Sequence, residues 1–159
     1  MSCTGGKITF NPAYYTEQGK LQEIIDTCTA SGWWPKNMKS GAIGAHEAAH
    51  GIEWYLDNNN PAYQYPRERV HAWNECTEAK AIVSQACKNI KKTPDGKGKI
   101  NADLLKTISR YGSSNASEAM AESFADVFCN GDEASAMSKE VVKLTTERYK
   151  QFGGKGNGW

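Results

Sequence analysis

Apolar residues recur every three or four positions along most of this chain, and this period limits its fold more than any other feature of the sequence. Such spacing places the apolar side chains on one helix face, and clusters of Gly, Pro and Asn separate the periodic segments. The pattern predicts helices at residues 17–29, 41–57, 67–91, 102–110, 115–130 and 134–152. One stretch, Lys7 to Phe10, alternates polar and apolar residues and predicts a strand. We therefore expect an α+β fold that is mostly helical.

The length and charge of the chain narrow its class. Its 159 residues fit one domain, which we place at residues 1–152, followed by a flexible Gly-rich tail at 153–159. The formal net charge is +1, which argues against a nucleic-acid binder that works by bulk charge. No apolar run reaches the roughly 20 residues of a membrane helix, and the N-terminus lacks a signal-peptide core. We expect a soluble protein with no membrane partner.

The five cysteines are an odd number, and none of them forms a CxxC pair. Such a set argues against a disulfide framework and against a zinc ribbon. Three of them fall at apolar positions of the helical patterns, where a reduced thiol packs as a small hydrophobic group. We expect free cysteines in a reducing compartment.

Two of the three histidines form the pattern His46-Glu47-Ala48-Ala49-His50, inside the helix predicted at residues 41–57. Positions i and i+4 share one helix face, so both imidazoles can hold a single zinc ion at about 2.0–2.1 Å. Glu47 is rotated by about 100° from His46 and lies beside the metal, where it can act as a general base. The alternative is a pair of hydrogen-bonded core histidines without a metal.

A catalytic zinc site needs a third protein ligand. His71 is one candidate. A better one lies in the ridge formed by Glu118, Glu122 and Asp126, which are four residues apart on a predicted helix otherwise rich in Ala, Met and Phe. Acidic groups in such surroundings are costly to bury unless they bind a cation or its ligands. The alternative is an amphipathic helix whose polar face is solvated.

A second motif lies downstream and resembles a known family. It reads Tyr-Gly-x-x-Asn-x-x-Glu-x-x-Ala-Glu-x-Phe and begins at Tyr111. It is similar to the catalytic signature of anthrax lethal factor-like peptidase domains, and with HExxH it resembles gluzincin-type zinc metallopeptidases. It also resembles the zincin-like domains of bacteriophage minor head and head-morphogenesis proteins. The resemblance covers residues 41–54 and 109–129, and more weakly the strand at 8–12.

The resemblance implies a minimal zincin-like fold with a short N-terminal sheet, an HExxH helix and a second helix that bears a glutamate ligand. It implies the zinc ligands His46, His50 and Glu118 and the catalytic residues Glu47 and Tyr111. Tyr111 would stabilise the oxyanion, and Glu122, with Asp126 one turn further, would lie behind the ligands and accept a hydrogen bond from a histidine. The choice between Glu118 and Glu122 as the ligand stays open, although the spacing from Tyr111 favours Glu118.

Residues 58–108 are not covered by the resemblance, and we expect them to be an insertion or a lid made of helices. Within them, we expect Trp73 to be a core residue and His71 a surface residue, with substrate contact as the alternative. Trp33 and Trp34 precede the HExxH helix, and we expect them to pack first and to line a cleft second.

The leading function is a zinc-dependent endopeptidase that acts on a peptide or protein, with a processing role such as phage head maturation. The strand at 7–10 would offer an edge to which an extended substrate adds. One alternative is a catalytically silent assembly domain associated with a virion. Another is a peptidase fragment of a toxin or effector, derived from a longer polypeptide. Glu47 and Tyr111 favour catalysis, because a purely structural site needs neither.

Overall fold

The computed structural model describes residues 2–4, 6–9, 12 and 19–155, and within them the fold is mostly helical. A 3-10 turn, η2 (Gly131–Glu133), follows α6 directly. None of the helices in the described part is long and apolar enough to cross a membrane. In chain order, the α-helices are α1 (Lys20–Ala30), α2 (Ser40–Asn59), α3 (Pro66–Asn74), α4 (Thr77–Ile90), α5 (Asn101–Lys106), α6 (Ala116–Asn130) and α7 (Ala136–Gln151).

The predicted N-terminal strand is present as β2 (Lys7–Thr9), and it pairs with a strand that was not predicted, β1 (Ser2–Thr4). The pair is antiparallel, with Cys3 opposite Ile8. Gly6 turns the chain with φ +75°, and a Cβ atom there would lie 3.0 Å from the ring of Trp54 on α2. The hairpin therefore packs on α2. Phe10, the last residue of the predicted strand, lies outside the described residues.

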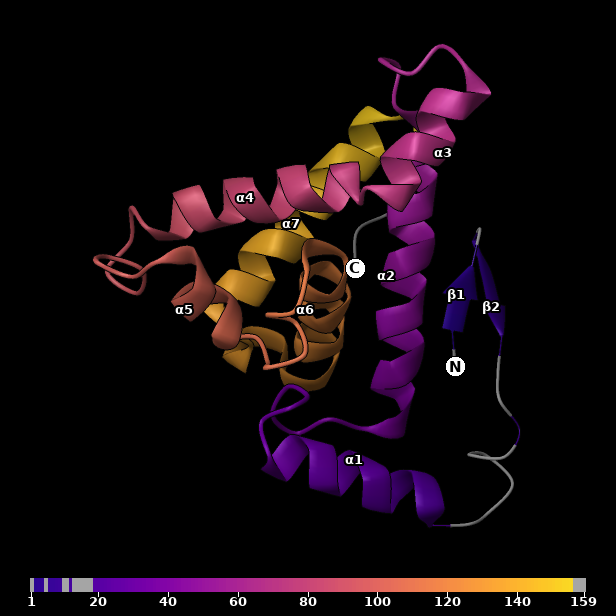
Figure 1. Ribbon diagram of the computed structural model, residues 1–159. Coiled ribbons are helices and arrows are strands. Elements are labelled where there is room, and N and C mark those ends of the chain that lie inside the picture. The colour runs from indigo at the N-terminus through magenta and orange to yellow at the C-terminus, as the bar shows by residue number, and fades with distance from the viewer. Residues whose placement is uncertain (1, 5, 10–11, 13–18, 156–159) are drawn as a thin grey trace.

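α2 is the central element (Figure 1). It has α6 along one side, the hairpin on another, α1 at its N-terminal end and α3 at its C-terminal end. Its contact with α6 is the most extensive between two elements, and the small buried residues Ala42 and Ala49 of α2 permit a close approach. Pro61 follows the helix and prevents it from continuing. α2 and α6 are the two helices that the sequence analysis singled out for their histidines and glutamates.

The single helix predicted at residues 67–91 is wrong, because the chain breaks into α3 and α4 at Cys76. Cys76 adopts φ +51°, in the left-handed region, which no α-helix can include. Val70, an apolar residue within that predicted helix, is 60% exposed. The break lets α3 pack on α2 while α4 crosses to α6 and α7. Tertiary packing therefore overrides a local helical pattern.

The main hydrophobic core lies between α2, α4, α5, α6 and α7. Residues 58–108 supply much of it, including Ile82, Cys87 and Leu104, all at most 2% exposed. α4 and α5 are therefore part of the core and do not form a lid over a cleft. A smaller cluster, which includes Ile25 and Met38, joins α1 to the start of α2 and to α6.

Two expectations concern the thiols and the C-terminal tail. Cys28, Cys76, Cys87 and Cys129 are free, and the side chain of Cys3 lies outside the described part. The N–H groups of residues 153 and 154 bond to the last turn of α7, so the start of the predicted flexible tail caps that helix. Residues 156–159 lie outside the described range.

Candidate metal centre

His46, His50 and Glu118 meet between α2 and the first turn of α6. The Nε2 atoms of the two histidines are 3.2 Å apart. Oε2 of Glu118 lies 3.3 Å from Nε2 of His46 and 3.7 Å from Nε2 of His50. A tetrahedral zinc ion with bonds of about 2.0–2.1 Å separates its ligand atoms by about 3.3 Å. The three atoms are thus spaced like the ligands of one zinc ion, and within the described residues they form the one such group.

The other ring nitrogen of His46 is held by Glu122, one helical turn after Glu118. His46 Nδ1 lies 2.8 Å from Glu122 Oε1, and Glu122 is fully buried. The second oxygen of Glu122 accepts a hydrogen bond from Ser109 Oγ at 2.8 Å, and Ser109 Oγ accepts one from the N–H of Gly112, also at 2.8 Å. The two glutamates thus have different positions in the site. Glu118 faces the Nε2 atoms of both histidines, and Glu122 faces Nδ1 of His46.

The other ring nitrogen of His50 has a similar arrangement, which the sequence analysis missed. His50 Nδ1 lies 3.1 Å from Ser117 Oγ, and Ser117 Oγ donates to Glu53 Oε2 at 2.5 Å. Glu53 is fully buried. The sequence contains a signal for Glu53, because this residue follows His50 by three positions and must share its helix face. Ser117 had no such signal beyond its place beside Glu118.

These hydrogen bonds determine which ring nitrogen of each imidazole carries a proton. Because the carboxylate of Glu122 can only accept, His46 donates from Nδ1 and its neutral Nε2 carries a lone pair. Ser117 gives its proton to Glu53, so His50 also donates from Nδ1. Two nitrogen lone pairs and a carboxylate oxygen then face one another. Such a group requires a cation between its members, and two histidines with one glutamate are a donor set typical of catalytic zinc.

Without a metal, protons are the cations that hold this group. Burial would lower the pKa of His50, but Glu118 and Glu53 outweigh it and raise that pKa to about 9. Burial would also lower the pKa of His46, but Glu118 and Glu122 outweigh this effect and raise that pKa. Burial would raise the pKa of Glu118, yet the two histidines hold it well below its usual range. A metal that binds here must displace these protons.

Glu47 and Tyr111 lie beside the cluster. The Tyr111 ring stacks on His46 with centroids 6.0 Å apart and planes 10° from parallel. Burial raises the pKa of the Tyr111 hydroxyl, and so do its hydrogen bond to Glu118 and the nearby charges of Glu118, Glu122 and Glu47. The hydroxyl is therefore protonated at neutral pH and lies near the Glu118 carboxylate. Glu47 is buried, at 7% exposed.

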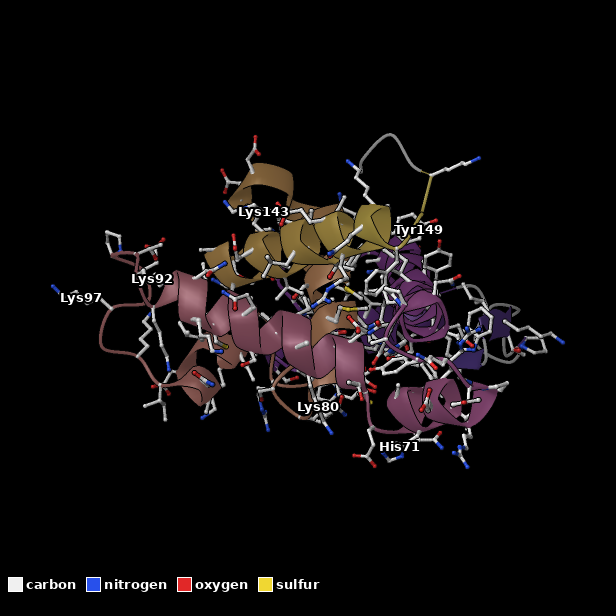
Figure 2. All side chains as sticks on the ribbon, turned by 90° about the horizontal axis from the view of Figure 1, so that it is seen from above. His71, Lys80, Lys92, Lys97, Lys143 and Tyr149 are labelled. Carbon is white, nitrogen blue, oxygen red and sulfur yellow. The ribbon has the colours of Figure 1, made fainter. Side chains whose placement is uncertain are left out.

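Two candidate residues of the sequence analysis are not brought to the site. Asp126 accepts hydrogen bonds from Ser138 Oγ at 2.6 Å and from the N–H of Ser135 at 3.0 Å. It ties α6 to α7 and does not reach a histidine, because it lies two turns beyond Glu118. His71 is exposed on the outer side of α3, as expected, and Figure 2 shows its side chain pointing away from the molecule.

The N-terminal cap of α6 fixes the backbone of Glu118 beside the histidines. Asn115 caps the helix by accepting a hydrogen bond from the N–H of Glu118 at 2.9 Å. The Glu118 side chain faces the histidines and does not bond back to the N–H of Asn115 to form a capping box.

Comparison of the chain with family models, curated proteins and solved structures finds no match. The geometry of the site is therefore the basis on which a function can be assigned.

Proposed function

We propose that this protein is a zinc-dependent endopeptidase of the gluzincin type, with a zincin-like arrangement of α2 and α6. The observation that supports this most is the convergence of His46, His50 and Glu118 at the spacing of zinc ligands. A purely structural zinc site is closed by four protein ligands, whereas three leave a position open for water and substrate. The buried Glu47 and the stacked Tyr111 next to the ligands favour catalysis.

Each residue has a distinct task in peptide hydrolysis. Zinc, when bound, supplies a Lewis acid that polarises the substrate carbonyl and makes a water more acidic. Glu47 accepts a proton from the attacking water and returns it to the leaving amine as the C–N bond breaks. Tyr111 donates its O–H to the carbonyl oxygen as negative charge develops there. Glu122 and the Ser117–Glu53 pair hold the two imidazoles in the required tautomer.

The proposal is tested with the purified chain, by metal analysis and by digestion of a random peptide library read by mass spectrometry. We expect one zinc per chain and new peptide termini. Glu47→Gln should retain zinc and lose about 10²–10⁴-fold in rate, because it removes the general base. The matched control is His71→Gln, which alters an exposed histidine and should cleave normally.

Two results would contradict the proposal. A chain that binds zinc tightly but leaves the whole library intact would favour the structural alternative. Equal cleavage by Glu47→Gln would remove Glu47 from the mechanism. We also propose a processing role such as phage head maturation, which rests on the motif resemblance. A search for cleaved head proteins would test this role.

A further inference from the structure

An aromatic column leads from the surface to the metal centre. The Trp33 and Tyr111 rings stack with centroids 5.4 Å apart and planes 24° from parallel. Tyr111 in turn stacks on His46. Trp33 is 40% exposed, so the stack begins at the surface of the protein. The exposed indole is thus two stacking contacts away from a candidate zinc ligand.

The backbone fixes Trp33 from one side. Gly32 adopts φ +70° just after α1, and the N–H of Trp33 donates to the carbonyl of Cys28 at 2.9 Å. This is a glycine-terminated helix end, and its hydrogen bonds tie the backbone of Trp33 to the last turn of α1. Through its contact with the start of α2, α1 places this end beside the metal centre.

The backbone also joins Trp33 to Tyr111. The N–H of Tyr111 donates to the carbonyl of Trp33 at 3.0 Å, and the N–H of Arg110 donates to the carbonyl of Gly32 at 2.9 Å. Next to Tyr111, a Cβ atom at Gly112 would lie 3.1 Å from Ser109 Oγ and 3.2 Å from Glu122 Cβ. The tyrosine backbone is therefore held on both sides, and its ring stacks with both the indole and an imidazole.

We infer that Trp33 is the positioning residue for Tyr111, and that it holds the phenol ring parallel to His46 with the hydroxyl aimed at the metal centre. Its catalytic value rests on the proposed function, because a Tyr111 hydroxyl matters only if an oxyanion forms there. Without the indole, one face of the phenol ring is open to water and the ring can rotate about χ1 and χ2. A displacement of about 1 Å can cost about 100-fold in rate. Trp33 thus acts through Tyr111 and needs no contact with substrate.

The first test reads the position of Tyr111 without any assay of activity. The chain is labelled with 3-fluorotyrosine, and the ¹⁹F resonance that disappears in Tyr111→Phe is assigned to Tyr111 among the seven tyrosines. Trp33→Leu should move this resonance toward that of free 3-fluorotyrosine, and Trp33→Phe, which keeps an aromatic face, should largely restore it. Trp73→Leu, a matched loss of an indole on α3, should leave it in place. An unmoved Tyr111 resonance in folded Trp33→Leu would overturn the inference.

The second test uses kinetics on a peptide cleaved by the unmodified chain. Trp33→Leu should lower kcat about tenfold or more with little change in KM, and Trp33→Phe should recover most of it. The double variant Trp33→Leu/Tyr111→Phe should be no slower than Tyr111→Phe alone, because Trp33 acts through the hydroxyl that is already gone. Additive losses would mean that Trp33 contacts substrate directly and would overturn the inference. If no peptide is cleaved, the proposed function fails, while the ¹⁹F result still decides the positioning role.

Discussion

Glu122 has the most sharply defined task among the single residues of the site. It is a fully buried carboxylate, and it accepts from His46 Nδ1 at 2.8 Å. Glu122→Gln keeps the shape of the side chain but removes the charge that favours this tautomer. We expect it to bind zinc about 10–100-fold more weakly, as measured by competition with a chromophoric chelator.

The matched control for Glu122→Gln is Asp126→Asn. Asp126 lies one turn further on the same helix, but its partners are Ser135 and Ser138 of the α6–α7 junction. This variant should lower thermal stability and leave zinc affinity unchanged. If both variants bind zinc as tightly as the unmodified chain, Glu122 does not orient His46.

The sequence predicts some of these residues and not others, for a physical reason. The spacing of His46 and His50 puts them on one helix face whatever surrounds them. Glu118 and Glu122 also share a face, and the sequence alone leaves open which one faces the two histidines. The answer depends on the position of α6 along α2. Packing between distant parts of the chain determines that position.

At the scale of elements, the junction of α2 and α4 contains buried carboxylates. Asp57, on α2, is fully buried. Burial and the charge of Glu53 raise its pKa to about 7, despite the nearby N–H of Glu78, and the Glu78 carboxylate adds to the rise. Arg148 of α7 is the cation at this junction, with Nε 3.5 Å from Glu78 Oε2.

The raised pKa predicts how stability changes with pH. The folded chain favours neutral Asp57, whereas the unfolded chain ionises it near its ordinary value of 3.8. The free energy of unfolding therefore falls as the pH rises from about 4 to about 7, because the folded protein must give up its preference for neutral Asp57. Above about pH 7, Asp57 causes no further change with pH. Asp57→Asn stays neutral, so its stability relative to the unmodified chain should increase between about pH 4 and pH 7 in urea unfolding and level off above that. A difference that does not vary with pH would show that Asp57 is ionised in the folded protein.

The same junction shows why element boundaries were harder to predict than element type. A helical period continues through residues 67–91, and nothing in it marks Cys76 as a break. The chain turns there because α3 must cover α2 while α4 reaches α6 and α7. Such a requirement belongs to the tertiary structure, and a local pattern does not contain it.

At the scale of the whole molecule, the candidate metal centre bridges two helices that are far apart in sequence. His46 and His50 belong to α2, and Glu118 belongs to α6. These helices also make the largest contact in the fold. A metal held by both opposes their separation, and because unfolding disperses the ligands, zinc should stabilise the entire domain.

The size of this effect can be estimated and measured. Zinc at a free concentration of 100 times Kd adds about 2.7 kcal/mol to the free energy of unfolding. For a domain of this length, that corresponds to a rise of about 5–10 °C in the thermal midpoint. Glu118→Gln should lose most of this rise, because it removes the ligand from α6. His71→Gln should keep all of it, because that histidine is exposed and is not a member of the cluster. An equal rise in Glu118→Gln would mean that zinc binds through α2 alone or at another place, and no rise in the unmodified chain would contradict the metal centre itself.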